Sequence, residues 1–171
     1  MSTGPGGLAS SIGSNQQAGD PTVEIKSTIN GKSIAVGVSD NDLLVDLLRD
    51  GLGLTGTKRS CEVEVCGACT VLVDGNPVSS CMLLASEIDG SSVVTIEGLR
   101  DTEFFRAAEE TFTRHAAVQC GFCTPGILLT LQAVAYREAS GNLDIKKELS
   151  GNLCRCTGYQ ALLAAATELL A

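Results

Sequence analysis

Residues 58–71 read KRSCEVEVCGACTV, and the spacing of their cysteines decides how the first half of the chain is interpreted. Cys61, Cys66 and Cys69 follow the pattern C-x4-C-x2-C, and Cys81 comes a short distance later. This is the spacing with which plant-type [2Fe–2S] clusters are held. Three thiolates on a tight loop wrap one side of such a cluster, and the fourth closes it. The glycine and alanine between Cys66 and Cys69 let the backbone approach the sulfides and donate N–H bonds to them.

A second set of four cysteines lies in the C-terminal half, as a CxxC and a CxC: Cys120, Cys123, Cys154 and Cys156. The CxxC alone is compatible with a thioredoxin-like redox pair, but that motif needs a βαβ context and the surroundings here are helical in pattern. The CxC alone is compatible with a soft-metal site. Each pair directly precedes a predicted helix, and helix N-termini favour the negative charge of a four-thiolate cluster. Together the four thiols predict a second [2Fe–2S] site.

Zinc is the main alternative metal that these cysteines could bind. A zinc site more often shows two CxxC pairs or histidines. The chain has one histidine, His115, which lies far from the first cysteine set in sequence. All ligand positions of both predicted clusters are already filled by cysteine, so we expect His115 to have a structural or surface role.

Composition narrows the classes of protein to which the chain can belong. The 171 residues carry a net charge of −8, which argues against binding to nucleic acid or to an anionic membrane surface. No apolar run reaches the length of a membrane-spanning helix. The first 20 residues lack the features of a signal peptide and are rich in Gly, Ser and Gln, so we expect a flexible tail. Eight cysteines without a secretion signal predict reduced metal ligands in a cytoplasmic protein rather than disulfides.

The hydrophobic pattern changes character near residue 98. Before it, alternating strands at 23–25, 34–36, 70–73 and 93–96 surround one helix at 42–49, with Ser39 or Asp40 as its N-cap and Asn30-Gly31 as a hairpin turn. After it, helices are predicted at 103–117, 127–139, 144–149 and 159–170. We therefore expect an α+β chain with a tail at 1–20, a strand-rich domain at 21–98 and an all-α domain at 99–171. Thr124 and Thr157, each just after a cysteine pair, are predicted N-caps that suggest an approximate two-fold repeat.

Longer motifs around the cysteines resemble a known family. KRSC (58–61), CGACTV (66–71) and Ser80-Cys81 are similar to the ferredoxin-like part of the molybdenum hydroxylases. QCGFCTPG (119–126) and NLCRCTGY (152–159) resemble their helical part, in the same order. The resemblance covers roughly residues 22–171 and is to the small iron–sulfur subunit of the xanthine oxidase family, which includes carbon monoxide dehydrogenase, aldehyde oxidoreductases and dehydrogenases of N-heterocycles.

This resemblance implies an N-terminal β-grasp, plant-type ferredoxin domain followed by a four-helix bundle with approximate two-fold symmetry. It implies an electron-transfer subunit that performs no substrate chemistry itself. Electrons would run from molybdopterin to the helical-domain cluster, then to the ferredoxin-type cluster and to FAD. Gln119 matches the glutamine that hydrogen-bonds the pterin, although as an isolated residue it would be interpreted as a solvated loop residue. Cys156 matches the cluster ligand that also touches the pterin amino group.

The resemblance also implies partners that this chain does not contain. These are a large subunit with molybdopterin, in its cytosine dinucleotide form, and a medium subunit with FAD, assembled as a dimer of heterotrimers. The chain itself carries no flavin or dinucleotide fingerprint. Two rival interpretations stay open: a free-standing two-cluster ferredoxin that serves diffusible partners, and a non-redox zinc or scaffold protein.

Two positions in the first cysteine loop depart from the family pattern. The family usually has Gly before the first cysteine, where this chain has Ser60, and commonly has Gly three residues after it, where this chain has Glu64. If the backbone at Glu64 has a positive φ, a glutamate is strained there. A carboxylate close to the cluster would also lower its reduction potential.

Overall fold

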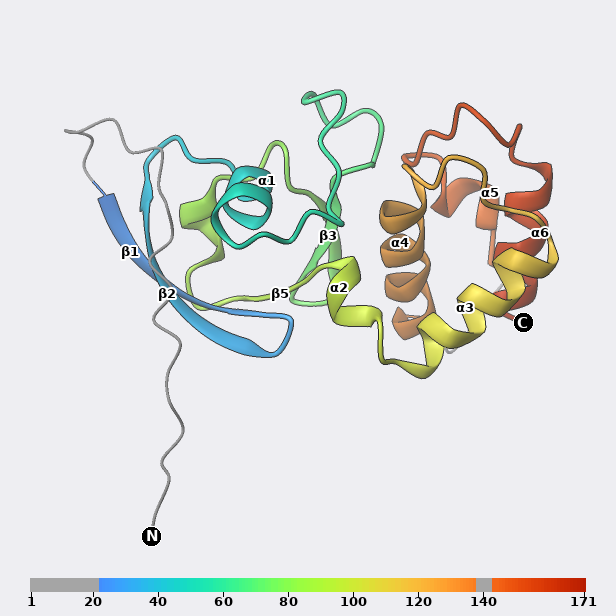
Figure 1. Cartoon of the computed structure of the whole chain (residues 1–171), viewed down its shortest axis with the longest axis horizontal. Coiled ribbons are helices and arrows are strands. Elements are labelled where there is room, and N and C mark those ends of the chain that lie inside the picture. The colour runs from blue at the N-terminus through green and yellow to red at the C-terminus, as the bar shows by residue number, and fades with distance from the viewer. Residues whose placement is uncertain (1–21, 138–142) are drawn as a thin grey trace, which may run out of the picture.

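The structure is a computed structural model, and it describes residues 22–137 and 143–171. Its strands gather in the N-terminal half and its longer helices in the C-terminal half, as Figure 1 shows. This arrangement confirms the predicted α+β class. The tail predicted for residues 1–20 lies outside the described residues.

The sheet has five strands in the order β2-β1-β5-β3-β4. β1 (Thr22–Ile29) and β2 (Lys32–Ser39) form an antiparallel hairpin, while β5 (Ser92–Val94) joins β1 in parallel and β3 (Thr70–Val73) in antiparallel fashion. β4 (Asn76–Ser79) pairs with β3 at the edge. The predicted turn at Asn30-Gly31 is confirmed, because both residues have positive φ, of 50° and 76°, as a two-residue hairpin requires.

The helix predicted at 42–49 begins later and changes type. It consists of α1 (Leu44–Asp46) and the π-helix η1 (Leu47–Gly51), in which the Leu52 N–H donates to the Leu47 carbonyl. The N-cap is Leu43 rather than Ser39 or Asp40, because Leu43 is held in extended conformation by a bridge to Leu84. The buried leucines of this segment pack on the sheet with Ile25, Ile29, Val71 and Val93.

The chain then turns from sheet to helices in a series of short elements. After β4 come η2 (Ala85–Ile88), β5, α2 (Ile96–Leu99) and α3 (Glu103–Arg114). The strand predicted at 93–96 was therefore too long, since Thr95 is already the N-cap of α2. Three further helices follow: α4 (Thr124–Arg137), α5 (Ile145–Glu148) and α6 (Gln160–Leu169). The predicted end of α4 at 139 lies outside the described residues.

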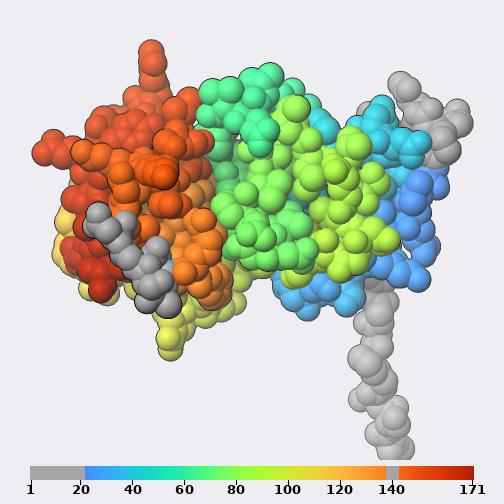
Figure 2. All heavy atoms as spheres, turned by 180° about the vertical axis from the view of Figure 1, so that it is seen from behind, coloured from blue at the N-terminus to red at the C-terminus, as the bar shows by residue number. Residues whose placement is uncertain are grey.

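Helix α4 joins the two halves of the molecule. Its residues from Gly126 to Val134 are all buried, and it stands beside β3 (Figure 1). Leu129 and Ala133 of α4 pack against Leu72 of β3 and Leu99 of α2 in one small core. Seen from behind, the two halves meet along a continuous contact (Figure 2). Within the described ranges no helix has the length and apolar character needed to cross a membrane.

Candidate metal centres

The first cysteine set is built on the loop between η1 and β3, and Cys81 reaches it from the segment after β4. The four thiols meet as two pairs. The Cys66 thiol hydrogen-bonds Cys61, and the Cys69 thiol hydrogen-bonds Cys81. Cys69 and Cys81 are each 2% exposed, whereas Cys61 and Cys66 are partly exposed. The set therefore has a buried pair and an outer pair.

Backbone N–H groups surround the outer pair. Those of Val63, Cys66 and Val65 donate to the Cys61 sulfur, and with the Cys66 thiol they lower the pKa of Cys61 to about 6. The loop can present these groups because Glu62 and Glu64 both have φ of 59°. Alternation of left-handed residues with ordinary ones turns successive N–H groups to one side and forms an anion-binding nest. The position is thus suited to a thiolate or to an anionic cluster.

Glu64 stood out in the sequence, and its left-handed backbone fulfils the condition for strain. For residues other than Gly, Asn and Asp this conformation costs of the order of 1 kcal/mol. Glu62 shares the conformation, although no feature of the sequence predicted it. Ser60, the other departure, is exposed and has no positive φ, so its side chain is accommodated.

Arg59 connects this loop to α1. Its guanidinium donates to both carboxylate oxygens of Glu62, at 3.0 and 3.3 Å, and also pairs with Asp46 at the end of α1. The hydrogen bond and charge of Arg59 hold the pKa of Glu62 below its usual value. Because all these groups are partly exposed, the energetic value of each ion pair is small, but their geometry fixes the strained residue next to Cys61.

The buried pair has a different environment. Burial raises the pKa of Cys69 to about 11, despite a backbone hydrogen bond from Cys81. The Ser80 hydroxyl donates to the Cys69 carbonyl at 2.7 Å and fixes the segment that carries Cys81. A bound metal centre would draw these thiols into the deprotonated state, because the thiolate is the form that binds metal.

The second cysteine set also meets as two pairs. The Cys156 thiol donates to the Cys120 sulfur at 3.5 Å, and the Cys123 thiol hydrogen-bonds Cys154. Cys120 and Cys156 are exposed, while Cys123 and Cys154 are partly buried. Burial raises the pKa of Cys123 to about 12. Burial also acts to raise the pKa of Cys154, but hydrogen bonds led by the Thr157 hydroxyl outweigh it and bring the pKa to about 7.

Thr157 and Tyr159 organise this second set in a way that sequence patterns did not predict. Thr157 is not an N-cap: α6 is capped by Tyr159, with φ of 68°, and the Thr157 hydroxyl donates to the Cys154 sulfur at 3.2 Å. The Tyr159 hydroxyl accepts from the Cys154 N–H at 2.7 Å and donates to the Asn152 carbonyl at 3.1 Å. The prediction of Thr124 as an N-cap is also wrong, because α4 begins at Thr124 itself.

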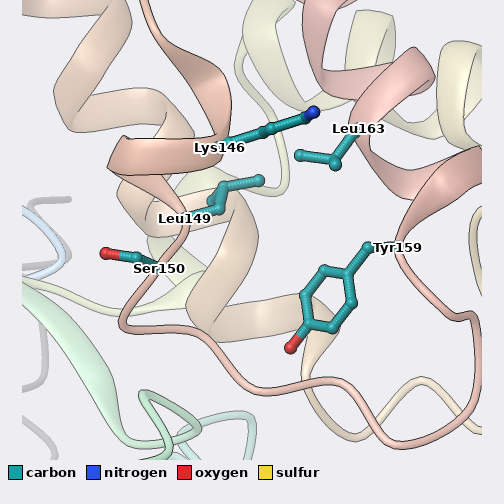
Figure 3. Close-up of a pocket in the computed structure, with 5 residues that line it drawn as sticks. All are labelled: Lys146, Leu149, Ser150, Tyr159 and Leu163. Carbon is teal, nitrogen blue, oxygen red and sulfur yellow. The ribbon is translucent and has the colours of Figure 1, made fainter.

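Tyr159 has a second environment on its other side. Its ring lines a shallow pocket of about 190 Å³ between α5 and α6, and its hydroxyl points to the loop that carries Cys154 (Figure 3). The other lining residues are Lys146, Leu149, Ser150 and Leu163. Through the two hydrogen bonds of its hydroxyl, Tyr159 supports the loop that carries Cys154.

Two polar residues shortly before Cys120 lie in different surroundings: Gln119 and His115. Gln119 is exposed beside the exposed Cys120. His115 ends α3 and its Nε2 lies 2.6 Å from a carboxylate oxygen of Glu168 on α6, where Arg114 also pairs. This contact is consistent with the structural role expected for His115.

The loops of the two sets touch one another. The Leu153 N–H donates to the Cys66 carbonyl at 2.9 Å, and the buried Asn152 amide donates to the Gly67 carbonyl at 3.3 Å. A Cβ on Gly67 would collide with Gly151 and Asn152, and one on Gly126 would collide with the Gly67 carbonyl oxygen. Both glycines are therefore needed for close approach, and the sequence alone assigned neither of them to a domain contact.

The donor set fits two-iron clusters. Each iron of such a cluster takes two thiolates, and the thiols here are grouped two by two, with backbone N–H donors at Cys61 and a hydroxyl at Cys154. Over residues 22–137 and 143–171, no three His, Cys, Asp or Glu side chains converge as ligands for a single ion. The residues that would hold the clusters are the eight predicted cysteines.

Two family models match the chain in sequence order. A 2Fe-2S iron-sulfur cluster binding domain matches residues 27–95, and a [2Fe-2S] binding domain matches residues 95–167. The junction between the two matches falls where the chain passes from β5 to α2.

Several known proteins are similar over most of the chain. The gamma subunit of caffeine dehydrogenase from Pseudomonas sp. (strain CBB1) is 45% identical, over 82% of this chain and 87% of its own length. The xanthine dehydrogenase iron-sulfur-binding subunit of Escherichia coli O157:H7 is 39% identical, over 83% of this chain and 91% of its own. The crystal structure of quinoline 2-oxidoreductase from Pseudomonas putida 86 has a chain with a TM-score of 0.79 and 45% identity, covering 86% of this chain and 91% of that one.

The contact between the loops gives a prediction for Gly126→Ala. The added methyl group overlaps the Gly67 carbonyl oxygen, which is backbone and cannot rotate away, so we expect a loss of about 1–3 kcal/mol in the free energy of unfolding. Urea unfolding monitored by circular dichroism measures this loss. Gly151→Ala is the matched control, because a Cβ there meets no atom within 4 Å. Equal stability of the two variants would contradict the packing argument.

Proposed function

This chain belongs to the small iron–sulfur subunits of the xanthine oxidase family of molybdenum hydroxylases, and we propose that it relays electrons from molybdopterin to FAD within such an enzyme. The membership makes it the iron–sulfur component of a molybdenum-containing oxidoreductase. The observation that carries the relay proposal is the direct contact between the two cysteine loops, through Cys66 and Leu153. Each [2Fe–2S] cluster takes up and releases one electron, and the contact brings the two sites together.

The proposed ligands are Cys61, Cys66, Cys69 and Cys81 for one cluster and Cys120, Cys123, Cys154 and Cys156 for the other. The two cysteine sets differ in how exposed their cysteines are, and this difference supports a direction for the relay. Cys120 and Cys156 are exposed beside Gln119, where an external pterin can reach them, and we assign Cys156 as the entry point and Gln119 as a pterin contact. Electrons would leave through the set that begins at Cys61, toward FAD on another subunit.

The finer features of the fold and assembly belong to the same proposal. We place the domain boundary at residues 98/99, after a tail at 1–20, and treat α3 to α6 as a four-helix bundle with approximate two-fold symmetry. The repeated position of a cysteine pair just before α4 and α6 supports that symmetry. The partners would be a large subunit with molybdopterin cytosine dinucleotide and a medium FAD subunit, in a cytoplasmic dimer of heterotrimers.

Metal analysis tests the cluster assignment. Eight cysteines at four per cluster give two clusters, and two irons in each give four irons per chain. We expect Cys81→Ser and Cys156→Ser each to remove one of two electron paramagnetic resonance (EPR) signals and to leave the other. Stoichiometric zinc with iron near zero would refute the electron-transfer proposal.

Co-purification distinguishes the relay subunit from a free-standing ferredoxin. A tagged chain isolated from its native cell is expected to bring two larger proteins with it, one with bound molybdopterin and one with FAD. The reason is that the exposed pair of the second set needs an electron donor held close to it. A chain that is isolated alone and exchanges electrons fully with diffusible partners would favour the ferredoxin alternative.

The strained loop gives a prediction for Glu64→Gly. Removal of the carboxylate takes a negative charge from the loop that carries Cys61 and Cys66, so the reduced state of the ferredoxin-type cluster becomes less unfavourable. Its midpoint potential is expected to rise, by an amount on the order of 30 mV. Redox titration followed by EPR measures the shift. Glu64→Gln removes the charge but keeps a side chain at the left-handed position, and so separates charge from backbone strain. An unchanged midpoint in both variants would contradict the prediction.

A further inference from the structure

Helix α1 contacts both halves of the first cysteine set. Its Val45 packs with the buried pair of cysteines, and the Val45 N–H donates at 3.0 Å to the carbonyl of Ser80, which directly precedes Cys81. The next residue of the helix, Asp46, accepts a hydrogen bond from Arg59, which lies at the beginning of the loop of the outer pair. The same short helix therefore holds the buried pair by packing and the outer pair through Arg59.

The guanidinium of Arg59 uses each of its three nitrogens in this contact. Nε and Nη2 donate to the two carboxylate oxygens of Glu62, at 3.0 and 3.3 Å, and Nη1 donates to Asp46. An isolated ion pair on a surface contributes little to stability, but a bidentate pair within a network of charges has a defined geometry. Arg59, Glu62 and Asp46, here called the Arg59 clamp, thus fix the loop to α1.

Glu62 is the residue at which the Arg59 clamp acts on the cluster site. It directly follows Cys61 and has a left-handed φ of 59°. With Glu64 at the same angle, it turns backbone N–H groups of the loop toward the Cys61 sulfur. A non-glycine residue keeps such an angle only where its surroundings hold it there. The hydrogen bonds to the Cys61 sulfur therefore depend on the angle at Glu62, and this angle depends on the Arg59 clamp.

We propose that Arg59 is a positioning residue that sets the midpoint potential of the ferredoxin-type cluster. By fixing Glu62 to α1, it keeps the backbone donors on Cys61 and holds the potential above the value that the loop would give without it. The inference rests on the proposed relay function. Donors at a ligand sulfur stabilise the reduced cluster more than the oxidised one, because reduction adds negative charge. Loosening of the Arg59 clamp would weaken these hydrogen bonds and lower the midpoint potential.

The first test uses the full chain with both clusters bound. Arg59→Lys keeps the positive charge but replaces the planar fork by one ammonium group, which cannot bind both oxygens of Glu62 and also Asp46 in the same geometry. The midpoint potential of the ferredoxin-type cluster, from redox titration followed by EPR, should shift to a lower value. Electron nuclear double resonance should show weaker coupling of exchangeable amide protons to the reduced cluster. The helical-domain cluster is the internal control and should keep its potential.

Glu62→Ala and Glu64→Ala form a matched pair that separates charge from position. Both variants remove one carboxylate from a residue with φ of 59°, and within the described residues only the carboxylate of Glu62 binds Arg59. Loss of charge alone would raise the midpoint potential in both. We expect a rise for Glu64→Ala and a fall for Glu62→Ala, because the second variant also weakens the backbone donors.

An equal rise of the midpoint potential in the two alanine variants would overturn the inference, because charge alone would then account for the potential. A wild-type midpoint and wild-type proton couplings in Arg59→Lys would overturn it as well. If Arg59→Lys does not bind the ferredoxin-type cluster, the alanine pair decides. A wild-type chain that binds zinc in place of iron would instead overturn the proposed function.

Discussion

The close approach of two backbones, at Gly67 on one side and at Gly126 and Asn152 on the other, is the constraint on which the rest of the molecule depends. Each glycine lies within a cysteine motif, so the residues that would hold the clusters and those that join the domains are the same short segments. A side chain at either glycine would separate the loops. Helix α4 adds to the constraint, because its buried face packs on β3 and begins at the very segment that carries Gly126.

The two cysteine sets stabilise negative charge on their sulfurs with different hydrogen-bond donors. A cluster held by four thiolates is anionic and needs donors around it. The first set supplies them from the backbone, through a nest that requires two glutamates in the left-handed region. The second set relies on the Thr157 hydroxyl and the backbone N–H groups near Cys154, at the beginning of α6. Hydrogen bonds to cluster sulfurs help to set reduction potential, so these differences give the chain a means of holding its two sites at different potentials.

Sequence patterns predicted the parts of this structure that are set locally. The Asn30-Gly31 turn and the strand at Thr70–Val73 depend on neighbours in the chain, and the structure has both at the predicted positions. The predictions failed where distant residues decide. The bridge of Leu43 to Leu84 delays α1, and Tyr159 replaces Thr157 as the cap of α6 because its hydroxyl is bound to the segment before it. The contact of Asn152 with Gly67 spans 85 residues, and no local period encodes it.

Arg59 accounts for one of the two left-handed glutamates of the first loop and not for the other. A left-handed glutamate at 62 or 64 is costly by itself, yet the loop needs these angles to turn its N–H groups toward Cys61. Arg59 binds both carboxylate oxygens of Glu62 and also Asp46 of α1, which over-determines the conformation at Glu62 from outside the loop. No such partner is bound to Glu64 among the hydrogen bonds of the described residues. The ion pairs of Arg59 partly offset the strain at Glu62, while strain at Glu64 is carried by the loop itself. Within this loop a glycine would therefore relieve more strain at position 64 than at position 62.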